Sequence, residues 1–368
     1  MKIHCNKADL SRGVATIQAA LSPRTTLPIL LNFLIETETS RLKLVSTDLE
    51  MGVKHYIPAE IEAGGSITIP AKKFSDIIHT LQDDQDIDLT VDTGGKVQLK
   101  SGRSRFSIIG APKSEYPVLP EFNQSNAFSV NAATMEDMIR KTLIAASSDE
   151  TRHVLNSAFW VASAGTLEMV TTDGRRLAVI KKACIPQGKE FRVIVPTKIL
   201  SELLRLLSQD RNAEDTLLVG VTENQIAFQF KTTTLLSRLV EGSFPNYEQV
   251  IPLKRDIQVV LDTKAFLGIT KRASLCASDR AGSVKFTLKK GLVHVFASSQ
   301  NLEFDDELPV EYDGEDFTIA FNPQFVLDGL KAFDCDKVTL SLTAPVNPAL
   351  FEPVGQTDYR YVVMPMRA

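Results

Sequence analysis

The feature that most constrains the fold of this 368-residue chain is that its sequence repeats itself. Residues 41–55 (RLKLVSTDLEMGVKH) and 166–182 (TLEMVTTDGRRLAVIKK) share one pattern, an alternating apolar strand, a Thr-Asp pair and a second strand. The aspartates of the two copies, Asp48 and Asp173, lie 125 residues apart. A spacing of this length is too long for a solenoid repeat and typical of a whole domain.

A second pattern extends the repeat to three copies. Residues 66–82 (SITIPAKKFSDIIHTLQ) match 192–208 (RVIVPTKILSELLRLLS), and a fainter copy stands at 317–333 (FTIAFNPQFVLDGLKAF). Leu200 and Phe325 are again 125 residues apart. Three similar domains in one chain favour a quasi-symmetric assembly, in which overall shape rather than one pocket carries the function.

The order of the patterns predicts an α+β fold with three similar domains, at 1–123, 127–250 and 254–368. Polar, proline-containing linkers at 120–127 and 250–257 separate them. Each domain should have two helices that back an antiparallel sheet. Apolar spacing predicts these helices at 7–20, 71–81, 131–148, 197–208, 262–277 and 323–333.

Composition indicates a soluble protein that we expect in the cytoplasm. The hydrophobic content of 43% and the charged content of 23% are ordinary for a globular chain. The first residues, MKIHCNKADL, contain no apolar run of the signal-peptide kind, and no stretch approaches transmembrane length. The cysteines are scattered without a CxxC pair, which favours reduced thiols over disulfides or a zinc site: Cys5, Cys184, Cys276 and Cys335.

The net charge of −4 argues against a protein that simply coats DNA. The charge is unevenly distributed, however. The six predicted helices contain twelve Lys and Arg residues against seven Asp and Glu, whereas the whole chain has 41 basic and 45 acidic residues. Helices of one sign and strands of the other would give the molecule one basic layer, although basic helix surfaces also serve solubility alone.

No catalytic signature is recognisable in the chain. The sequence lacks GxxxxGK[ST], GxGxxG, HExxH and GxSxG, so the usual phosphate loops, zinc helices and nucleophile elbows are missing. The five histidines lie far apart, and we expect no metal or cofactor. The acidic runs 83–84 and 305–307 are better explained as solvated loops than as metal sites, and Asp48 and Asp173 as turn-stabilising residues.

Two segments are unusual for a plain scaffold. Residues 361–368 (YVVMPMRA) are apolar and rich in methionine near a terminus, where chains are commonly frayed and polar. Methionine suits a surface that accepts several partners, although a last strand packed into the third core explains the pattern equally well. Residues 172–177 (TDGRRL) place two arginines beside a glycine turn.

Several segments together resemble one known family. Residues 25–30 (TTLPIL), 46–51 (STDLEM), 101–106 (SGRSRF), 171–179 (TTDGRRLAV) and 244–247 (FPNY), with the terminal YVVMPMR, resemble the bacterial DNA polymerase III beta subunits, the sliding clamps. The resemblance covers the whole chain in order. It implies a head-to-tail homodimeric ring whose helices line a channel around duplex DNA, with the antiparallel sheets outside, and no catalysis.

The resemblance also implies partners. Such a ring would bind DNA without sequence preference and tether the replicative polymerase, the clamp loader, repair polymerases and mismatch-repair factors. A closed ring holds DNA by topology, so a mildly basic lining suffices, and strong phosphate binding would impede sliding. Other function classes stay open on residues alone, namely an enzyme with its site between the repeats and a monomeric interaction scaffold.

Candidate DNA-facing residues come from the family motif and from the helices. The motif gives Arg24, and the basic helix faces give Lys72, Lys73, Lys198 and Arg205. The segment 149–155 (DETRHVL) departs from the family, which often has an aromatic pair where His153 and Val154 stand, while Arg152 could still reach a phosphate.

The family also implies two different interface surfaces and one peptide groove. One side of the subunit interface would use Arg103, Arg105, Phe106 and Ile108, and the other Leu275, Cys276, Glu303, Asp305, Asp306 and Glu307. The groove would take a short extended peptide of each partner through Leu155, Thr172, Gly174, Arg175, Arg176, Leu177, Pro245, Val250, Val362, Met364, Pro365, Met366 and Arg367. Ala368 replaces a larger aliphatic residue at one edge of this groove.

Overall fold

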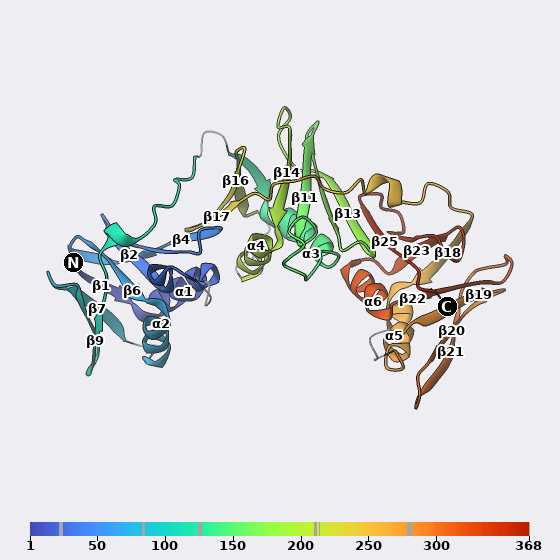
Figure 1. The fold of residues 1–368 in the computed structure, drawn as a ribbon, viewed down its shortest axis with the longest axis horizontal. Coiled ribbons are helices and arrows are strands. Elements are labelled where there is room, and N and C mark those ends of the chain that lie inside the picture. Colours follow the sequence, from blue (N-terminus) through green and yellow to red (C-terminus); the bar gives the residue numbers. More distant parts are fainter. Residues whose placement is uncertain are drawn as a thin grey trace. The chain divides into compact units, whose positions relative to one another are not determined.

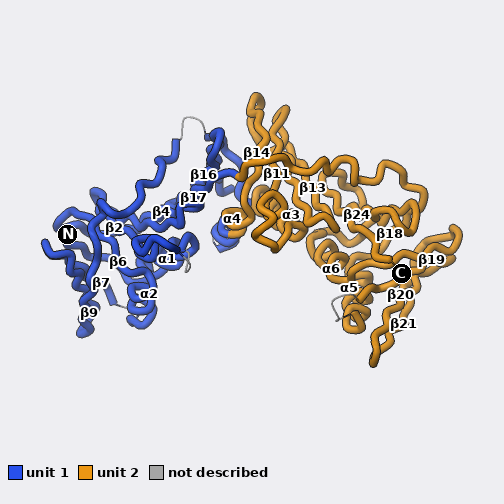
Figure 2. The backbone as a smooth tube through the Cα atoms, in the orientation of Figure 1, with its two compact units in different colours: residues 1–133, 202–239 blue, residues 134–201, 240–368 orange. Residues whose placement is uncertain are grey.

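The computed structural model describes residues 1–21, 25–82, 85–123, 127–209, 212, 214–277 and 282–367. The chain forms two compact units, which Figure 2 colours separately. Unit 1 comprises Met1–Ala133 and Glu202–Leu239, and unit 2 comprises Thr134–Ser201 and Val240–Ala368. In the described residues, each unit contains one eight-stranded sheet and one smaller sheet, and all neighbouring strands are antiparallel.

The large sheet of unit 1 joins strands from distant parts of the chain. Its order is β10 (Phe128–Asn131), β15 (Thr216–Val221), β16 (Gln225–Phe230), β17 (Thr233–Arg238), β4 (Met51–Pro58), β3 (Arg41–Thr47), β2 (Asn32–Glu38) and β6 (Ser66–Pro70). The five-stranded sheet has the order β5 (Glu60–Ala63), β1 (Lys2–Asn6), β7 (Asp86–Val91), β8 (Lys96–Ser101) and β9 (Ser104–Ile109). Exposed and buried residues alternate along strand β8.

Two helices lie side by side in unit 1, α1 (Lys7–Ile17) and α2 (Ala71–Thr80), as Figure 1 shows. The Asn6 side chain caps α1 by accepting hydrogen bonds from the N–H groups of Ala8 and Asp9. Buried apolar side chains such as Val14 and Phe74 form the inner face of the pair. Short 3₁₀ helices occupy Gln18–Ala20, Pro28–Leu31 and Lys113–Glu115.

Unit 2 repeats this organisation. Its large sheet has the order β14 (Phe191–Pro196), β11 (Ser157–Ser163), β12 (Thr166–Thr172), β13 (Arg176–Ala183), β25 (Tyr359–Val363), β24 (Ala349–Pro353), β23 (Lys337–Leu342) and β18 (Ile257–Asp262). The four-stranded sheet has the order β21 (Glu303–Pro309), β20 (Leu292–Ser298), β19 (Val284–Lys289) and β22 (Phe317–Phe321). A 3₁₀ helix occupies Glu248–Val250.

Helices α5 (Thr263–Ala273) and α6 (Pro323–Ala332) pack against each other in unit 2 (Figure 1). Asp262 caps α5 and Asn322 caps α6, so both begin where the apolar pattern predicts. The remaining helices are α3 (Ala132–Leu143) and α4 (Thr197–Gln209), within which the division between the units falls.

Three helices are shorter by several residues than their sequences predict. The expected helix at 7–20 ends at Ile17, that at 131–148 ends at Leu143, and that at 262–277 ends at Ala273. After each end, N–H groups bond to carbonyls three residues back, as Ala145 does to Thr142 and Cys276 to Ala273. The tighter turn keeps apolar residues facing inward, so periodicity alone does not reveal where the α-helix stops.

The repeats pair with one another through matching strands. In unit 1, β4 pairs with β17 so that Gly52 lies opposite Leu236, a place we call the β4–β17 junction. In unit 2, β13 pairs with β25 so that Leu177 lies opposite Val362, the β13–β25 junction. Each large sheet therefore takes strands from two of the three predicted domains. The predicted domain boundaries concern the repeats in the sequence and stay a prediction.

Candidate functional site

An apolar cluster lies at the β13–β25 junction and includes two of the predicted groove residues, Leu177 and Val362. Its buried members come from strands β12, β13, β24 and β25 and from the segment after residue 250: Val170, Leu177, Val179, Ile251, Leu350 and Val362. Phe159, Phe244 and Tyr247 pack against it, and the rings of Phe159 and Phe244 stack with centroids 5.2 Å apart. Three aromatic rings beside aliphatic side chains give this junction a firm apolar floor.

The rim of the cluster is partly exposed. The side chain of Met364 is 36% exposed and that of Val250 is 40% exposed, while Arg175 and Arg367 are also exposed. Backbone hydrogen bonds fix the last segment of the chain, because Met364 N–H donates to Arg175 O at 2.8 Å and Met366 N–H donates to Ala320 O at 2.8 Å. Exposed apolar side chains on a fixed backbone can dock a partner without prior folding.

The turn between β12 and β13 is built on Asp173. Its carboxylate accepts hydrogen bonds from the N–H groups of Arg175 at 2.8 Å and Arg176 at 3.0 Å. Gly174 has a φ of 89°, a region that glycine enters without steric cost. Asp48 makes the same bonds to Glu50 and Met51 in unit 1, so the turn-stabilising role predicted for both aspartates is confirmed.

The side chain of Arg176 is held in place by two carboxylates and an aromatic ring. Its guanidinium bonds to Asp173 at 3.1 Å and to Asp328 at 2.6 Å, and lies 4.5 Å from the centre of the Phe325 ring. Burial by itself would lower the pKa of Arg176, but the neighbouring Tyr361, Asp328 and Asp173 raise it above its ordinary value. Arg176 therefore links the β12–β13 turn to α6, whereas the side chain of Arg175 is exposed.

Arg152 lies at this same turn. Its side chain donates to the carbonyl oxygen of Asp173 at 3.2 Å, and its own carbonyl accepts from Leu155 N–H at 2.8 Å. The structure thus brings Arg152, predicted to face DNA, together with Leu155 and the turn predicted to bind peptide. The Tyr247 hydroxyl donates a hydrogen bond to Glu168. Burial first, and then this bond, raises the pKa of Tyr247.

The other candidate DNA-facing residues lie on helices. Lys72 and Lys73 are exposed on α2 and form no ion pair with another described residue. Lys198 is exposed in the first turn of α4, and Arg205 on the same helix bonds to Glu202 at 2.8 Å. Arg24 lies outside the described residues.

The candidate interface residues lie on two sheet edges. Arg103 and Arg105 are exposed at strand β9, the last strand of the five-stranded sheet, and the acidic run lies on β21, the last strand of the four-stranded sheet. An unpaired edge strand is a ready template for another chain. Leu275 is largely exposed beside Cys276, which is buried.

Sequence reasoning chose the less exposed of two isoleucines on β9. Ile108 is 7% exposed and faces the interior of its own unit, whereas Ile109 is 69% exposed. Arg105, Ser107 and Ile109 share the exposed face of this strand, as its alternation indicates. Phe159, Phe244 and Tyr247 were likewise not among the predicted groove residues, although the FPNY segment contains two of them.

The acidic run is already partly neutralised within its own chain. Asp306 bonds to Arg272 at 2.7 Å, which lowers the Asp306 pKa, and Asp305 lies 2.9 Å from His294. Glu303 and Glu307 are exposed on the same strand. Within the described ranges, no three His, Cys, Asp or Glu side chains are grouped to hold a metal ion. Asp83, Asp84 and Ala368, weighed from sequence, lie outside these ranges.

Comparison with known proteins assigns the family. Three models of the DNA polymerase III beta subunit match in succession, the N-terminal domain at residues 1–120, the central domain at 129–246 and the C-terminal domain at 248–367. The chain belongs to the DNA polymerase III beta subunit family. Its resemblance to this family, read from the sequence, is confirmed, as are the α+β fold and the three similar domains.

Full-length relatives agree with this assignment. The beta sliding clamps of Synechocystis sp. and Haemophilus influenzae are 32% and 31% identical, covering 100% of this chain and 99% and 100% of theirs. The solved sliding clamp of Pseudomonas aeruginosa bound to griselimycin is 32% identical with a TM-score of 0.94, covering 100% of both chains. That of Bacillus subtilis is 27% identical with a TM-score of 0.95, covering 100% of this chain and 99% of its own.

No described helix combines the length and apolarity needed to cross a bilayer. The four cysteines are free, and none is paired with another.

Proposed function

We propose that two copies of this chain close head to tail into a ring around duplex DNA and tether the replicative polymerase to it, without catalysis. The observation that carries the proposal is the succession of three family domains along the whole chain. The protein would act in the cytoplasm, and its other partners would be the clamp loader, repair polymerases and mismatch-repair factors.

Strands β9 and β21 support the head-to-tail arrangement. Each is a sheet edge, and they carry opposite charge, with Arg103 and Arg105 on one and Glu303 and Glu307 exposed on the other. A subunit with two complementary edges can pair each edge with the opposite edge of a second copy, which closes a ring. Backbone pairing would hold the ring, and the charges would set its register.

The helices support contact with DNA. Lys72, Lys73 and Lys198 are exposed, so their ammonium groups can meet phosphates. Because the ring encircles the duplex, these contacts need only be weak, and the protein can slide.

The deciding experiment is retention on nicked circular DNA after loading by a clamp loader, in moderate salt, before and after the circle is linearised. We expect stable retention on the circle and rapid loss from the linear form, because a ring leaves DNA only at an end. Equal, salt-sensitive binding to both forms would mean ordinary electrostatic binding and would overturn the proposal.

The apolar cluster at the β13–β25 junction would be the groove for the partners' peptides. Its exposed rim residue Met364 gives the test, since Met364→Lys places a charge where an apolar anchor should dock. We expect this variant to lose binding of a polymerase-derived peptide by at least tenfold in fluorescence anisotropy while keeping its dimeric mass. Undiminished peptide affinity would remove Met364 from the site.

A further inference from the structure

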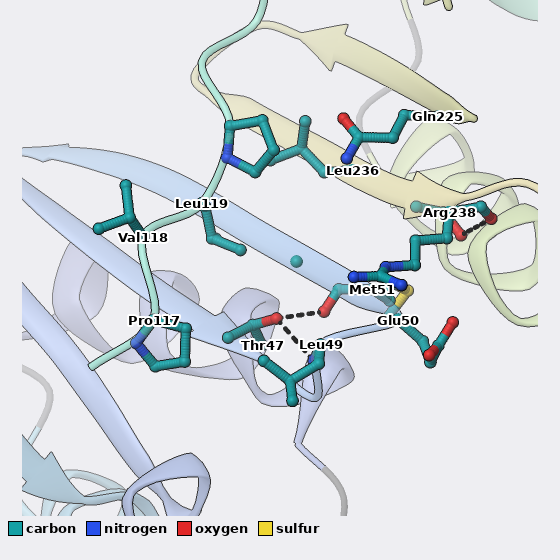
Figure 3. A pocket seen from close by; sticks show the side chains of 13 residues that line it. Thr47, Leu49, Glu50, Met51, Pro117, Val118, Leu119, Gln225, Leu236 and Arg238 are labelled. Carbon is teal, nitrogen blue, oxygen red and sulfur yellow. Dashed lines mark hydrogen bonds between the residues drawn. The ribbon is translucent and has the colours of Figure 1, made fainter. Parts of the chain in front are cut away.

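A second hollow lies at the β4–β17 junction of unit 1 (Figure 3). It encloses about 180 Å³ between the β3–β4 turn, the end of β17 and residues 117–120, which lead into the predicted linker at 120–127 and are called the linker segment below. Leu119, Leu236 and Met51 are among the residues that line it. Nothing in the function proposed above uses this hollow.

The hollow has the same backbone construction as the β13–β25 junction. Arg238 N–H donates to Glu50 O at 2.9 Å, as Met364 N–H donates to Arg175 O at 2.8 Å. The Oγ1 atom of Thr47 donates to Met51 O at 2.8 Å, and that of Thr172 donates to Arg176 O at 2.6 Å.

The tips of the two turns also correspond. Leu49 has a φ of 78°, close to the 89° of Gly174. A leucine in this left-handed region is strained by about 1–2 kcal/mol, and its side chain is 43% exposed at the mouth of the hollow. An apolar side chain held outward on a strained turn points to contact with something beyond the chain.

The side chains give the hollow a different chemistry. Gly52 in β4 corresponds to Leu177 in β13. The side chain of Leu119, from the linker segment, covers Gly52, because a Cβ on this glycine would lie 2.9 Å from Leu119 Cδ1. The floor is thus still aliphatic, but the linker supplies it. In Figure 3 Leu119 turns inward from the linker, whereas Val118 points away.

The positive charge of Arg238 indicates which kind of ligand would suit this hollow. Arg238 occupies the position that corresponds to Met364 of unit 2, and it is exposed. Its guanidinium has no hydrogen bond or ion pair with another described residue. Figure 3 shows it reaching into the hollow, while the Glu50 carboxylate points outward. An unpaired guanidinium beside an aliphatic floor suits a carboxylate next to an aliphatic side chain.

We propose that this hollow is a second peptide site, which takes an extended segment of a partner protein with an aliphatic residue adjacent to an aspartate or glutamate. The aliphatic side chain would lie on Leu119 and Leu236, and the carboxylate would bind Arg238. The proposal rests on the peptide-binding role proposed for the β13–β25 junction, because the shared backbone is the reason to expect the same mode of docking.

The methionines allow a direct test. With methyl-¹³C methionine, the full-length protein gives seven signals, of which Met51 reports on the hollow and Met364 on the other junction. The probes are acetyl-Leu-Asp-Leu-Gly-amide and acetyl-Leu-Lys-Leu-Gly-amide, titrated to millimolar concentration. We expect the aspartate peptide to shift Met51 saturably and to bind at least fivefold more tightly there than the lysine peptide.

Variants locate the effect. Arg238→Met copies the residue of the other junction and should weaken the aspartate peptide about tenfold at Met51, and Arg238→Lys should restore part of the loss. Met364→Lys should leave the Met51 titration unchanged. The second site would be overturned by a Met51 signal that never moves, by equal affinity for both peptides in the native protein, or by an Arg238→Met variant that binds the aspartate peptide as tightly as the native protein does. If only the Met364 signal failed to shift, the result would count against the groove at the β13–β25 junction and not against the hollow at the β4–β17 junction.

Discussion

Gly329 and Gly268 both lie within helices, but only one of them has room for a side chain. A Cβ on Gly329 of α6 would lie 2.3 Å from Cε1 of the Tyr361 ring. The ring is buried, and its hydroxyl donates to Phe325 O at 2.8 Å, so it cannot move aside. A Cβ on Gly268 of α5 would meet nothing closer than 3.7 Å. Only the first glycine is required by packing.

Gly329→Ala should therefore destabilise the protein and Gly268→Ala should stabilise it. We expect a loss of about 1–3 kcal/mol in the free energy of unfolding for the first, from overpacking against Tyr361. The second should gain about 0.5–1 kcal/mol from helix propensity. Urea unfolding followed by circular dichroism measures both, and equal effects of the two substitutions would contradict this account.

His55 makes the stability of unit 1 depend on pH. Burial first, and then Arg12, lowers the His55 pKa to about 4, against the partial opposition of Asp9. Its Nδ1 lies 2.8 Å from Thr233 Oγ1. In the unfolded chain this histidine is protonated below about pH 6.5, whereas in the folded protein it stays neutral down to about pH 4. The free energy of unfolding therefore falls as the pH falls from about 6.5 to about 4.

The variant His55→Gln should lose this dependence, because glutamine can keep a hydrogen bond to Thr233 without titrating. Between pH 7 and pH 4.5 we expect the native protein to lose roughly 2–3 kcal/mol more than the variant. Unfolding midpoints in urea across this range give the difference. Parallel pH profiles would show that His55 is not the group responsible.

At the scale of elements, substitutions of the two isoleucines of β9 should affect folding and self-association separately. Ile108 faces the interior and Ile109 faces solvent on an edge strand. Ile108→Ala should lower the free energy of unfolding by about 2–4 kcal/mol through a cavity. Ile109→Lys should leave unfolding nearly unchanged but weaken self-association, because a lysine on an edge opposes strand pairing.

Sedimentation at decreasing concentration tests the second half of this prediction. Ile109→Lys, and separately Arg103→Glu with Arg105→Glu, should shift the protein from dimer to monomer at concentrations where the native chain stays dimeric. An unchanged mass on dilution for both would remove β9 from the interface.

Sequence reasoning captured the elements better than their partners. The alternation around Asp48 and Asp173 predicted two strands and a turn, because those features depend on local hydrogen bonds. It did not predict that Leu236 would lie opposite Gly52, since that pairing joins residues 184 positions apart. Arg152 was likewise assigned to DNA alone, because nothing local reveals its bond to Asp173.

For the whole molecule, the repeated sequence and the compact unit are different divisions of the chain. Strands β15, β16 and β17 of the second predicted domain belong to unit 1, and β11 to β14 belong to unit 2. The second repeat therefore depends on strands from outside itself. β17 pairs with β4, and β13 pairs with β25.

Residues 127–250 produced alone should fail to form a stable monomer. Removal of β4 and β25 frees two interior strand edges, which favours aggregation. We expect oligomers or precipitate by size-exclusion chromatography with light scattering, and an intermediate result for residues 1–250, which restore β4. A monodisperse, folded 127–250 fragment would show that the repeat is an independent folding unit.

The matching backbone of the two junctions has a consequence for descent. The bonds from Arg238 to Glu50 and from Met364 to Arg175 use only main-chain atoms, which nearly every residue type provides. Mutations at these positions can therefore accumulate without separating the strands. The scaffold can be inherited while the side chains that face a ligand change, so the two junctions need not share a binding preference.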